Sequence, residues 1–304
     1  MRKSMGVGRV SVVIPLYNHE KYIAQAVESV LVQGELLKEL IVIDDGSTDR
    51  SASIMEGLSS RDSRIKFAKQ ENCGAHATIN RGLALATGEF VAILNSDDCF
   101  VPGRLVALVR ALDLDAGSDL ASSSIGFFNG DGYDIQNEWF DKALEKFILR
   151  RDIAVSLIDA NYLMTTSNFL MRASLLEKVG FFADLRYAHD LEFALRCRAQ
   201  GVRFCFINKM LLKYRFHSSN TISENHAKVR AEWALCAASY LRQRYQVCSE
   251  DSAYAEIKNV ISLHGLSDMV EIALDALKRA GIFQLTDEFM AESKILDQIT
   301  KAAQ

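Results

Sequence analysis

Hydrophobic residues in the first 130 positions form short, mostly β-branched runs, separated by stretches in which they recur at helical spacing. Continuous apolar runs of this length predict strands that are buried on both faces. They cover residues 10–16, 39–44, 64–68, 90–94 and 120–128. The helical spacing predicts helices at about 19–32, 49–58, 75–86 and 102–112. Strands that alternate with helices imply right-handed βαβ units, and therefore an α/β fold with a mostly parallel sheet.

Residues at the ends of these segments support the predicted helices. Asn18 and Asp49 precede the first two helices, and both are of types that cap helix N-termini. Pro102 suits the first turn of the fourth helix, and Gly88 follows the third, where helices commonly end.

The second half of the chain has a weaker pattern. Residues 129–160 indicate little beyond a turn, 168–173 predict a short strand, and 204–216 predict one or two strands. Residues 189–200 predict an amphipathic helix that ends before Gly201. From about Ser223 onward the spacing is helical. We expect these last helices to pack on the preceding domain, with dimerisation or peripheral membrane contact as the alternatives.

The composition limits the classes of protein to consider. A chain of 304 residues with 49% hydrophobic residues can bury a large core, as one α/β domain with an appendage or as two modest domains. The net charge of −4 argues against nucleic-acid binding through phosphate contacts. The six cysteines include no close metal-ligand pair and are expected to be reduced and mostly buried.

The sequence gives no targeting or membrane signal. Residues 1–8 lack the apolar core of a signal peptide, and no apolar run approaches the ~20 residues of a membrane span. We therefore expect a cytoplasmic location, with peripheral contact at the inner membrane surface as the alternative for the C-terminal helices.

Three polar clusters each follow a predicted strand. Tyr17 follows the first strand, the pair Asp44–Asp45 stands at the end of the second, and the pair Asp97–Asp98 comes after the strand at 90–94. In parallel sheets, ligands bind beyond the carboxyl ends of the strands. We therefore expect the three clusters to converge on one edge of the sheet.

The adjacent carboxylates of Asp97 and Asp98 repel each other, and a bound cation would offset this repulsion. Mg²⁺ and Mn²⁺ take oxygen ligands, often one or two carboxylates together with substrate phosphates. Taken alone, the pair is explained more simply by a solvated turn or a cap before Pro102. His217 follows a strand and is a candidate third ligand. No comparable signal is given by His19, His76, His226 and His264.

The residues from Asp44 to Asp49 suit recognition of a nucleotide. Gly46 permits a tight turn, but this turn does not explain two acids at a strand exit. An aspartate there can accept a hydrogen bond from the N3–H of uracil, and Tyr17 offers a flat face for a base, although ordinary packing explains Tyr17 alone. Asn72 and Gly74 lie between a strand and a helix, where backbone N–H groups favour phosphate. Neither GxGxxG nor GxxxxGK[ST] occurs, so a dehydrogenase-type fold and a P-loop are not supported.

Asp190 stands at the start of the helix predicted at 189–200. An acid there complements the helix dipole, which is a sufficient structural explanation in isolation. The functional interpretation is a general base that takes a proton from a hydroxyl group. The helix end favours the ionised carboxylate, which suits a base at neutral pH.

Seven segments of the chain, in order, resemble those of the family 2 glycosyltransferases, which have the GT-A fold. They are PLYN, IDDGSTD, NCGAHATINRGLALATGEF, LNSDD, TSNFLMRASLLEKVGFF, HDLEFALR and YRFHSSN, within about residues 9–222. The resemblance implies a metal-dependent enzyme, with Mn²⁺ or Mg²⁺, that transfers a sugar with inversion from a nucleoside diphosphate donor, usually UDP-linked. The implied acceptor is a hydroxyl of a saccharide or lipid-linked molecule, because family members often build surface polysaccharide, O-antigen or capsule.

The resemblance also implies roles for individual residues. Asp190 corresponds to the catalytic base, and Asp97, Asp98 and His217 correspond to the residues near the metal. By this resemblance the expected nucleotide site includes Pro15, Tyr17, Asp44, Asp45 and Asp97, and Asn72 and Gly74 are added because they lie between a strand and a helix. The chain departs from the family pattern at two positions: Asn95 stands where an acid commonly begins the DxD-type motif, and His189 replaces the glutamate before the base.

The resemblance implies a GT-A catalytic domain over residues 1–222 and a helical extension over 223–304. Donor binding falls at about 9–115 and the acceptor side at about 116–222. The alternatives are a nucleotidyltransferase of related fold, a phosphoacceptor receiver domain and a non-catalytic nucleotide-sugar binding module. PLYNHEKY stands where a nucleotidyltransferase needs a glycine-rich basic loop, and a receiver domain is shorter with its acids after the first strand.

Overall fold

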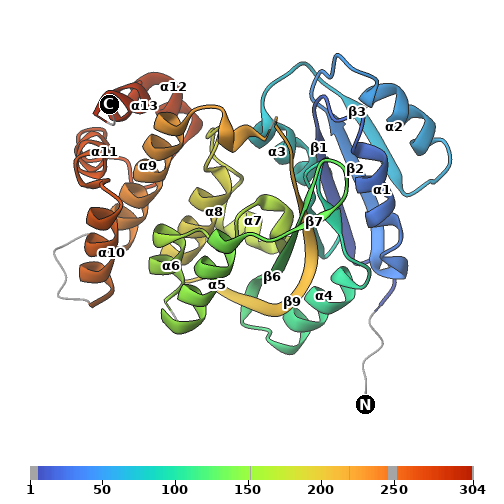
Figure 1. Cartoon of the computed structure of the whole chain (residues 1–304), viewed down its shortest axis with the longest axis horizontal. Coiled ribbons are helices and arrows are strands. Elements are labelled where there is room, and N and C mark those ends of the chain that lie inside the picture. The colour runs from blue at the N-terminus through green and yellow to red at the C-terminus, as the bar shows by residue number, and fades with distance from the viewer. Residues whose placement is uncertain (1–5, 151, 219, 246–251, 303–304) are drawn as a thin grey trace. The chain divides into compact units, whose positions relative to one another are not determined.

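The computed structural model describes residues 6–150, 152–218, 220–245 and 252–302 (Figure 1). The chain forms two compact units. The sheet unit comprises Met1–Gln136, Thr165–Gly180 and Arg203–His217, and the helical unit comprises Asn137–Met164, Phe181–Val202 and Ser218–Gln304. The predicted boundary at residue 222, between a catalytic domain and a helical extension, stays a prediction.

The sheet unit contains one mixed sheet with the strand order β3-β2-β1-β4-β8-β6-β9-β5. Its first part is parallel and consists of β1 (Val10–Leu16), β2 (Leu37–Asp44), β3 (Ile65–Lys69) and β4 (Phe90–Ile93). These strands are the predicted apolar runs, and nearly all residues of β1, β2 and β4 are buried. The prediction of a parallel βαβ arrangement is therefore confirmed for this part of the chain.

The second part of the sheet contains long-range pairings. The short strand β8 (Leu170–Arg172) runs antiparallel to both β4 and β6 (Ser118–Asn129), so β4 and β6 point the same way. The strand β9 (Arg203–Phe216) is parallel to β6. As a result, the carboxyl ends of β1, β2, β4 and β9 all point toward one edge. Two short strands complete the sheet: β5 (Cys99–Phe100) pairs with β9, and β7 (Asp134–Ile135) pairs with β6.

The helices of the sheet unit are α1 (Ile23–Leu31), α2 (Ser51–Ser59), α3 (Ala75–Leu85), α4 (Arg104–Leu114) and α7 (Ser174–Val179). Short 3₁₀ helices lie at Gly34–Leu36 and Thr166–Asn168. Helix α3 packs on β1 and β2, and α4 packs on β6 and β9. Gly82 allows the close approach of α3, because a Cβ there would lie 2.3 Å from Cγ1 of Val13.

The predicted cap at Asn18 is wrong, because α1 begins only at Ile23. Asn18 adopts a left-handed backbone with φ of 51°, and its Oδ1 accepts from the N–H of Thr48 at 2.8 Å. The side chain thus joins the turn after β1 to the loop after β2 instead of starting a helix. Asp49 accepts from the N–H of Ser51 at 2.9 Å, but it stands one residue before the N-cap position of α2, which is Arg50.

The helical unit is organised around α9 (His226–Arg244), which packs against α8 (His189–Ala199), α11 (Ser267–Arg279) and α13 (Ile295–Ala302). Its remaining helices are α5 (Glu138–Arg150), α6 (Ile153–Asp159), α10 (Ser252–Leu263) and α12 (Asp287–Ser293), with a 3₁₀ helix at Thr221–Ser223. The prediction of helices after residue 223 is confirmed.

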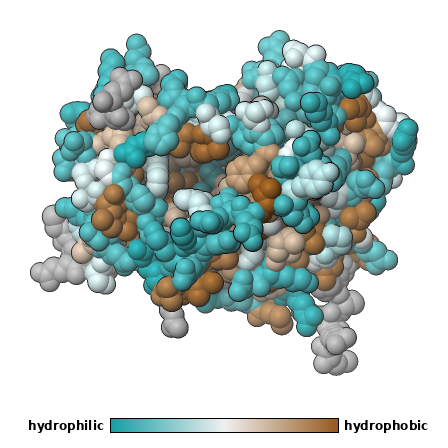
Figure 2. All heavy atoms as spheres, viewed as in Figure 1, coloured by the Kyte–Doolittle hydropathy of each residue, from teal (hydrophilic) through white to brown (hydrophobic). Residues whose placement is uncertain are grey.

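Helix α8 is not amphipathic, which corrects the prediction. Every residue from Asp190 to Cys197 is buried. The polar residues are tolerated because Glu192 and Arg196 form a buried ion pair at 2.8 Å. No helix among the described residues combines the length and hydrophobicity needed to cross a bilayer. The molecular face in Figure 2 is mostly hydrophilic, with hydrophobic residues scattered over it.

Candidate active site

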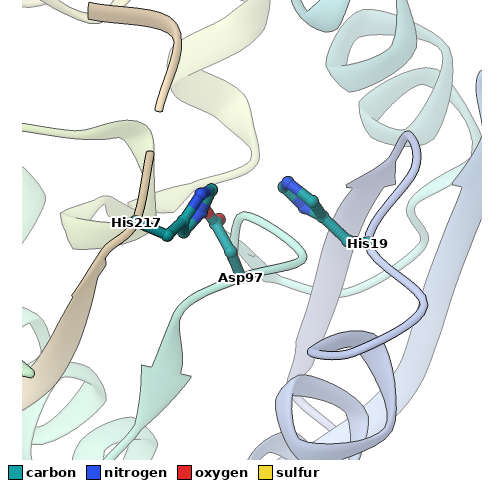
Figure 3. Close-up of side chains that lie close together, drawn as sticks. All are labelled: His19, Asp97 and His217. Atoms are coloured by element: carbon teal, nitrogen blue, oxygen red, sulfur yellow. The ribbon is translucent and has the colours of Figure 1, made fainter. Parts of the chain in front are cut away.

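Three side chains gather at the carboxyl ends of β1, β4 and β9 (Figure 3). His19 follows β1, Asp97 follows β4, and His217 follows β9 directly. One ring nitrogen of each histidine and one carboxylate oxygen all lie within 4.8 Å of one another. Within this cluster, Nε2 of His217 is 2.9 Å from Oδ2 of Asp97. The parallel strands thus bring a carboxylate and two imidazoles together. Two of these three residues, Asp97 and His217, were predicted from the sequence.

His19 was missed because its place in the cluster depends on the turn after β1. The N–H of His19 donates to Oγ of Ser51 at 3.0 Å, and its Nδ1 lies 2.8 Å from Oγ of Ser96. These contacts bring the ring back toward the loop after β4. The sequence does place His19 three residues after the end of β1, in the same segment as Tyr17. A position just beyond a strand end is therefore the signal that could have identified it.

Arg215 fixes the end of β9 beside the loop that carries Asp97. Its Nε donates to the backbone oxygen of Asp97 at 2.8 Å, and its guanidinium lies 4.6 Å from the ring centre of Tyr22 and 4.0 Å from that of Phe128. The ring of Tyr22 also packs against His217, with ring centres 5.0 Å apart. These contacts restrain His217 relative to Asp97.

The electrostatics of the cluster favour an ionised Asp97. Burial opposes its ionisation, but the hydrogen bond with His217 and the nearby ring of His19 outweigh burial, so the pKa of Asp97 is lowered. Burial lowers the pKa of His19, which favours the neutral imidazole despite the pull of Asp97. A carboxylate and a neutral imidazole are the forms that bind metal ions.

Asp98 has different surroundings from Asp97. Its Oδ2 accepts from Oγ of Ser167 at 2.6 Å, and its Oδ1 accepts from the N–H of Arg215 at 3.0 Å. Asp98 is buried, and burial together with the charge of Asp97 raises its pKa well above the usual range. The carboxyl group therefore joins the loop after β4 to β9 and to the 3₁₀ helix at 166–168, and it is not part of the three-residue cluster.

Asn95, where the family commonly has an acid, also holds this loop. Its Nδ2 donates to Oγ1 of Thr165 at 3.0 Å, and its Oδ1 accepts from Oγ1 of Thr166 at 3.1 Å. Its own N–H donates to Oγ of Ser167 at 2.9 Å. The amide can serve two hydroxyl groups at once, as donor and as acceptor, which a carboxylate cannot do.

The two acids at the end of β2 also differ. Both oxygens of Asp45 are used in the loop before α3: Oδ1 accepts from Gln70 Nε2 at 2.7 Å and from the N–H of Cys73 at 2.9 Å, and Oδ2 accepts from the N–H of Gly74 at 2.9 Å. Asp44 is buried, and its Oδ1 has no hydrogen-bond partner among the described residues. Asp44 is thus the acid with an unused acceptor.

The remaining residues predicted for the nucleotide site lie around these acids. Pro15 is in β1, opposite Ile43 of β2, and Tyr17 is 46% exposed immediately after β1. Asn72 is exposed in the loop that Asp45 holds. The N–H of Gly74, which the sequence had suggested for phosphate, is used by Asp45.

Asp190 belongs to the helical unit, as the second residue of α8. Nδ2 of Asn161 donates to its Oδ2 at 3.0 Å. Burial raises the pKa of Asp190 to about 6, outweighing the hydrogen bonds from the N–H of Leu191 and from Asn161. The helix end was expected from the sequence to favour the ionised form of Asp190, but burial outweighs this effect. A carboxyl group with this pKa is nevertheless mostly ionised at neutral pH and can take up a proton.

The possible metal ligands in the sheet unit include nitrogen as well as oxygen donors. Two imidazole nitrogens and one carboxylate oxygen are within reach of one position. Mg²⁺ prefers oxygen ligands and keeps several waters, whereas first-row transition metals accept imidazole. Of the two ions predicted from the sequence, Mn²⁺ is the one that matches these donors.

The comparison with known families gives a match over more than half of the chain. Residues 11–186 match the sequence model described as "Glycosyl transferase family 2". An uncharacterized glycosyltransferase of Methanocaldococcus jannaschii is 28% identical over 213 residues, which cover 68% of this chain and 70% of the relative. The glycosyltransferase GlyG of Streptococcus pneumoniae serotype 4 is 27% identical over 221 residues, covering 69% and 72%.

A solved structure supports the fold. TarS of S. aureus, crystallised in complex with UDP-GlcNAc, superposes with a TM-score of 0.59 over 97% of this chain and 90% of that one. The two sequences are 19% identical, so the likeness concerns the fold. The α/β fold with a mostly parallel sheet and C-terminal helices, predicted as GT-A, is confirmed.

Proposed function

The chain belongs to glycosyl transferase family 2, and from this premise we propose that it is a Mn²⁺-dependent, inverting transferase that uses a UDP-sugar. The observation that carries the proposal is the convergence of His19, Asp97 and His217 at the sheet edge where β2 also delivers Asp44. A metal site at the same sheet edge as an unused buried acceptor suits a ligand that combines a diphosphate with a base.

The donor site is proposed at the ends of β1 and β2. Tyr17 is exposed and offers a face for the base, and the unpartnered Oδ1 of Asp44 can accept the N3–H of uracil. Pro15 shapes the end of β1 beside Tyr17. Asp45 acts by holding the loop that contains Asn72 and Gly74, which borders the site. A buried acceptor without a partner is costly, and a bound uracil would satisfy it.

The metal is proposed to be held by His19, Asp97 and His217. When bound there, the ion would offset the negative charge that develops on the departing diphosphate. Asp97, and not Asp98, is the carboxylate whose geometry supports a direct ligand role. Asp98, predicted from the sequence as a ligand, is better suited to hold the loop through Ser167 and Arg215.

Asp190 is proposed as the general base. Its carboxylate removes the proton of the acceptor hydroxyl while the acceptor oxygen attacks the anomeric carbon. The bond from that carbon to the donor phosphate oxygen breaks, UDP leaves, and the configuration at the anomeric carbon inverts. The pKa of about 6 places the base close to neutral pH, where a general base transfers protons most effectively.

The first experiment is a screen of UDP-, GDP- and dTDP-sugars for release of the nucleoside diphosphate, with Mn²⁺, with Mg²⁺ and with EDTA. We expect a UDP-sugar with Mn²⁺ to give the highest rate, and EDTA to abolish it. In the Asp190→Asn variant, turnover should fall at least about a hundredfold while UDP binding changes little. Metal-independent turnover, or normal turnover by this variant, would contradict the proposal, and binding without turnover would support the non-catalytic alternative.

The acceptor and the cellular role are proposed at a coarser level. A saccharide or lipid-linked acceptor in surface-polysaccharide synthesis follows from the family and from relatives that carry glycosyltransferase names. The cytoplasmic location and the dimer or peripheral membrane contact through the C-terminal helices stay predictions.

A further inference from the structure

A buried acid on α9 holds the segment that leads into α8. Both carboxylate oxygens of Glu232 are used: Oε1 accepts from the N–H of Arg186 at 3.0 Å, and Oε2 accepts from the N–H groups of Tyr187 at 2.7 Å and Ala188 at 2.8 Å. Glu232 is only 3% exposed. Three consecutive backbone N–H groups on one carboxylate form the kind of concave anion site that backbone turns make.

This contact replaces a cap that α8 lacks. Ala188 is the residue at the N-cap position, and it makes no side-chain capping bond. The first backbone bond of the helix runs from the N–H of Glu192 to the oxygen of the same Ala188. Glu232 therefore fixes the peptide group that starts α8, and Asp190 follows two residues later. Hydrogen bonds to a buried charged acceptor are worth about 1.5–3 kcal/mol each, so the contact is strong enough to set the position of the helix end.

A second contact from α9 supports the same point. Sγ of Cys236, one turn after Glu232, donates to the backbone oxygen of Ala188 at 3.7 Å. On the other side, Asn161 donates to Asp190 from the turn after α6. The start of α8 is thus held from two directions within the helical unit, by α9 through its backbone and by Asn161 through the Asp190 side chain.

We propose that Glu232 is a positioning residue for Asp190, and that the helices after residue 223 therefore belong to the catalytic machinery. The proposal rests on the proposed role of Asp190 as the base. Glu232 holds the backbone that carries Asp190, and its negative charge also disfavours ionisation of the aspartate. Further titratable or charged groups around this contact are His189, Glu192 and Arg196 on α8, Cys236 on α9, and Asp184 in the preceding loop.

The chain offers a matched control in Glu224. This acid binds the same loop, but through the guanidinium of Arg186, with two contacts of 2.8 Å in a half-exposed position. Exposed ion pairs of this kind contribute about 0–1 kcal/mol. Glu232→Gln and Glu224→Gln thus remove one negative charge each from neighbouring contacts, and only the first touches the backbone before α8.

Two measurements on the free full-length protein test the hold of Glu232 without any substrate. The first is hydrogen exchange of the amides of residues 186–192, followed by mass spectrometry. The second is the pH at which the Asp190 carboxyl titrates, followed by carbon-13 NMR and assigned with Asp190→Asn. In Glu232→Gln we expect exchange at least about tenfold faster and titration at lower pH, because a neighbouring negative charge is lost. Glu224→Gln should match wild type in both.

The kinetic measurement uses UDP-GlcNAc, or the donor with the highest rate in the screen. Glu232→Gln should lower kcat at least about tenfold and leave the donor KM within about twofold. Glu232→Asp keeps the charge with a shorter reach; it should lower kcat without moving the titration, and it serves if the glutamine variant does not fold. Unchanged exchange and titration in Glu232→Gln, or equal effects in Glu224→Gln, would overturn the proposal. Normal turnover by Asp190→Asn would instead contradict the proposed role of Asp190 as the base, and with it the catalytic part of this proposal, whereas the exchange and titration results test the contact of Glu232 separately.

Discussion

Nε2 of His217 lies 2.9 Å from Oδ2 of Asp97, although 120 positions of sequence separate the two residues. The contact arises because β4 and β9 both direct their carboxyl ends to the same edge of the sheet. It makes Asp97 the acid that faces the imidazoles. Asp98, its neighbour in the chain, is turned to Ser167 and the backbone of Arg215.

Substitutions of Asp97 and Asp98 are therefore expected to have different effects on stability and on UDP binding. Asp98→Ala leaves two buried donors without a partner, at about 1–3 kcal/mol each, and should lower the free energy of unfolding by about 2–6 kcal/mol. Asp97→Ala should destabilise the protein less and abolish metal-dependent UDP binding. Urea unfolding and UDP titration of both variants would check this, and the reverse ranking in stability would contradict it.

His19 should set the preference of the site for Mn²⁺ over Mg²⁺. Removing one imidazole by His19→Ala should weaken Mn²⁺ binding at least about tenfold, while Mg²⁺, which prefers oxygen ligands, should change less than about threefold. Metal titrations followed by calorimetry measure both affinities. His226→Ala provides the control, because His226 is exposed at the start of α9. Equal losses for the two ions would remove His19 from the ligand set.

The rate should depend on pH through Asp190. Its active form as a base is the carboxylate, and its pKa is raised to about 6. We expect kcat/KM to fall about tenfold per pH unit below about 6 and to be flat just above it. A pH–rate profile with the preferred donor checks this. An acid limb with a midpoint near pH 4 would mean that burial does not raise the pKa of Asp190 in the free enzyme.

The same pKa shift makes a prediction about stability. The pKa of Asp190 is higher in the folded protein than the ordinary value of 3.8, so the folded state binds the proton more tightly. The corresponding stability is present below pH 4 and is lost as the pH rises through about 6, by at most about 3 kcal/mol. Asp190→Asn avoids this loss. At pH 8 the melting temperature of Asp190→Asn should equal or exceed that of wild type, and the difference should disappear toward pH 4. The loss of activity in this variant then cannot be ascribed to unfolding.

The packing of α3 on β1 is tested by two glycines. Gly82→Ala places a Cβ 2.3 Å from Cγ1 of Val13 and should destabilise the fold by about 1–3 kcal/mol. Gly57→Ala in α2 meets no heavy atom within 4 Å and should stabilise it by about 0.5–1 kcal/mol. Thermal unfolding of the two variants should therefore move in opposite directions, and destabilisation by both would contradict this account of the packing.

The strands of the sheet core could be predicted from the sequence because their burial demands continuous apolar runs, as in 10–16 and 90–94. No helix was predicted within 129–160, although Phe140, Ala143 and Phe147 of α5 recur at helical spacing and the first two are buried. Helix α5 could therefore have been predicted from the sequence. The pairing of β8 between β4 and β6 depends on contacts between distant segments. Such pairings are decided by tertiary packing, which a local pattern does not contain.

The site was predictable where a side chain follows a strand directly, as for His217, and less so where a turn intervenes. His19 reaches the cluster through a turn with a left-handed Asn18 and a bond to Ser51. Asp97 and Asp98 look alike in sequence, and only the three-dimensional contacts separate them. The link from Glu232 to the start of α8 joins positions 44 to 46 residues apart and leaves no local motif.

The most direct test of the central claim is the affinity of the wild-type protein for UDP, measured by calorimetry with Mn²⁺ and with EDTA, alongside Asp97→Asn. We expect Mn²⁺ to tighten UDP binding at least about tenfold in wild type, because a cation held by Asp97 would offset the charge of the diphosphate, and we expect Asp97→Asn to bind UDP equally weakly under both conditions. UDP binding that is tight without metal, or a metal effect that survives in Asp97→Asn, would contradict the claim that His19, Asp97 and His217 form the metal site of this glycosyltransferase.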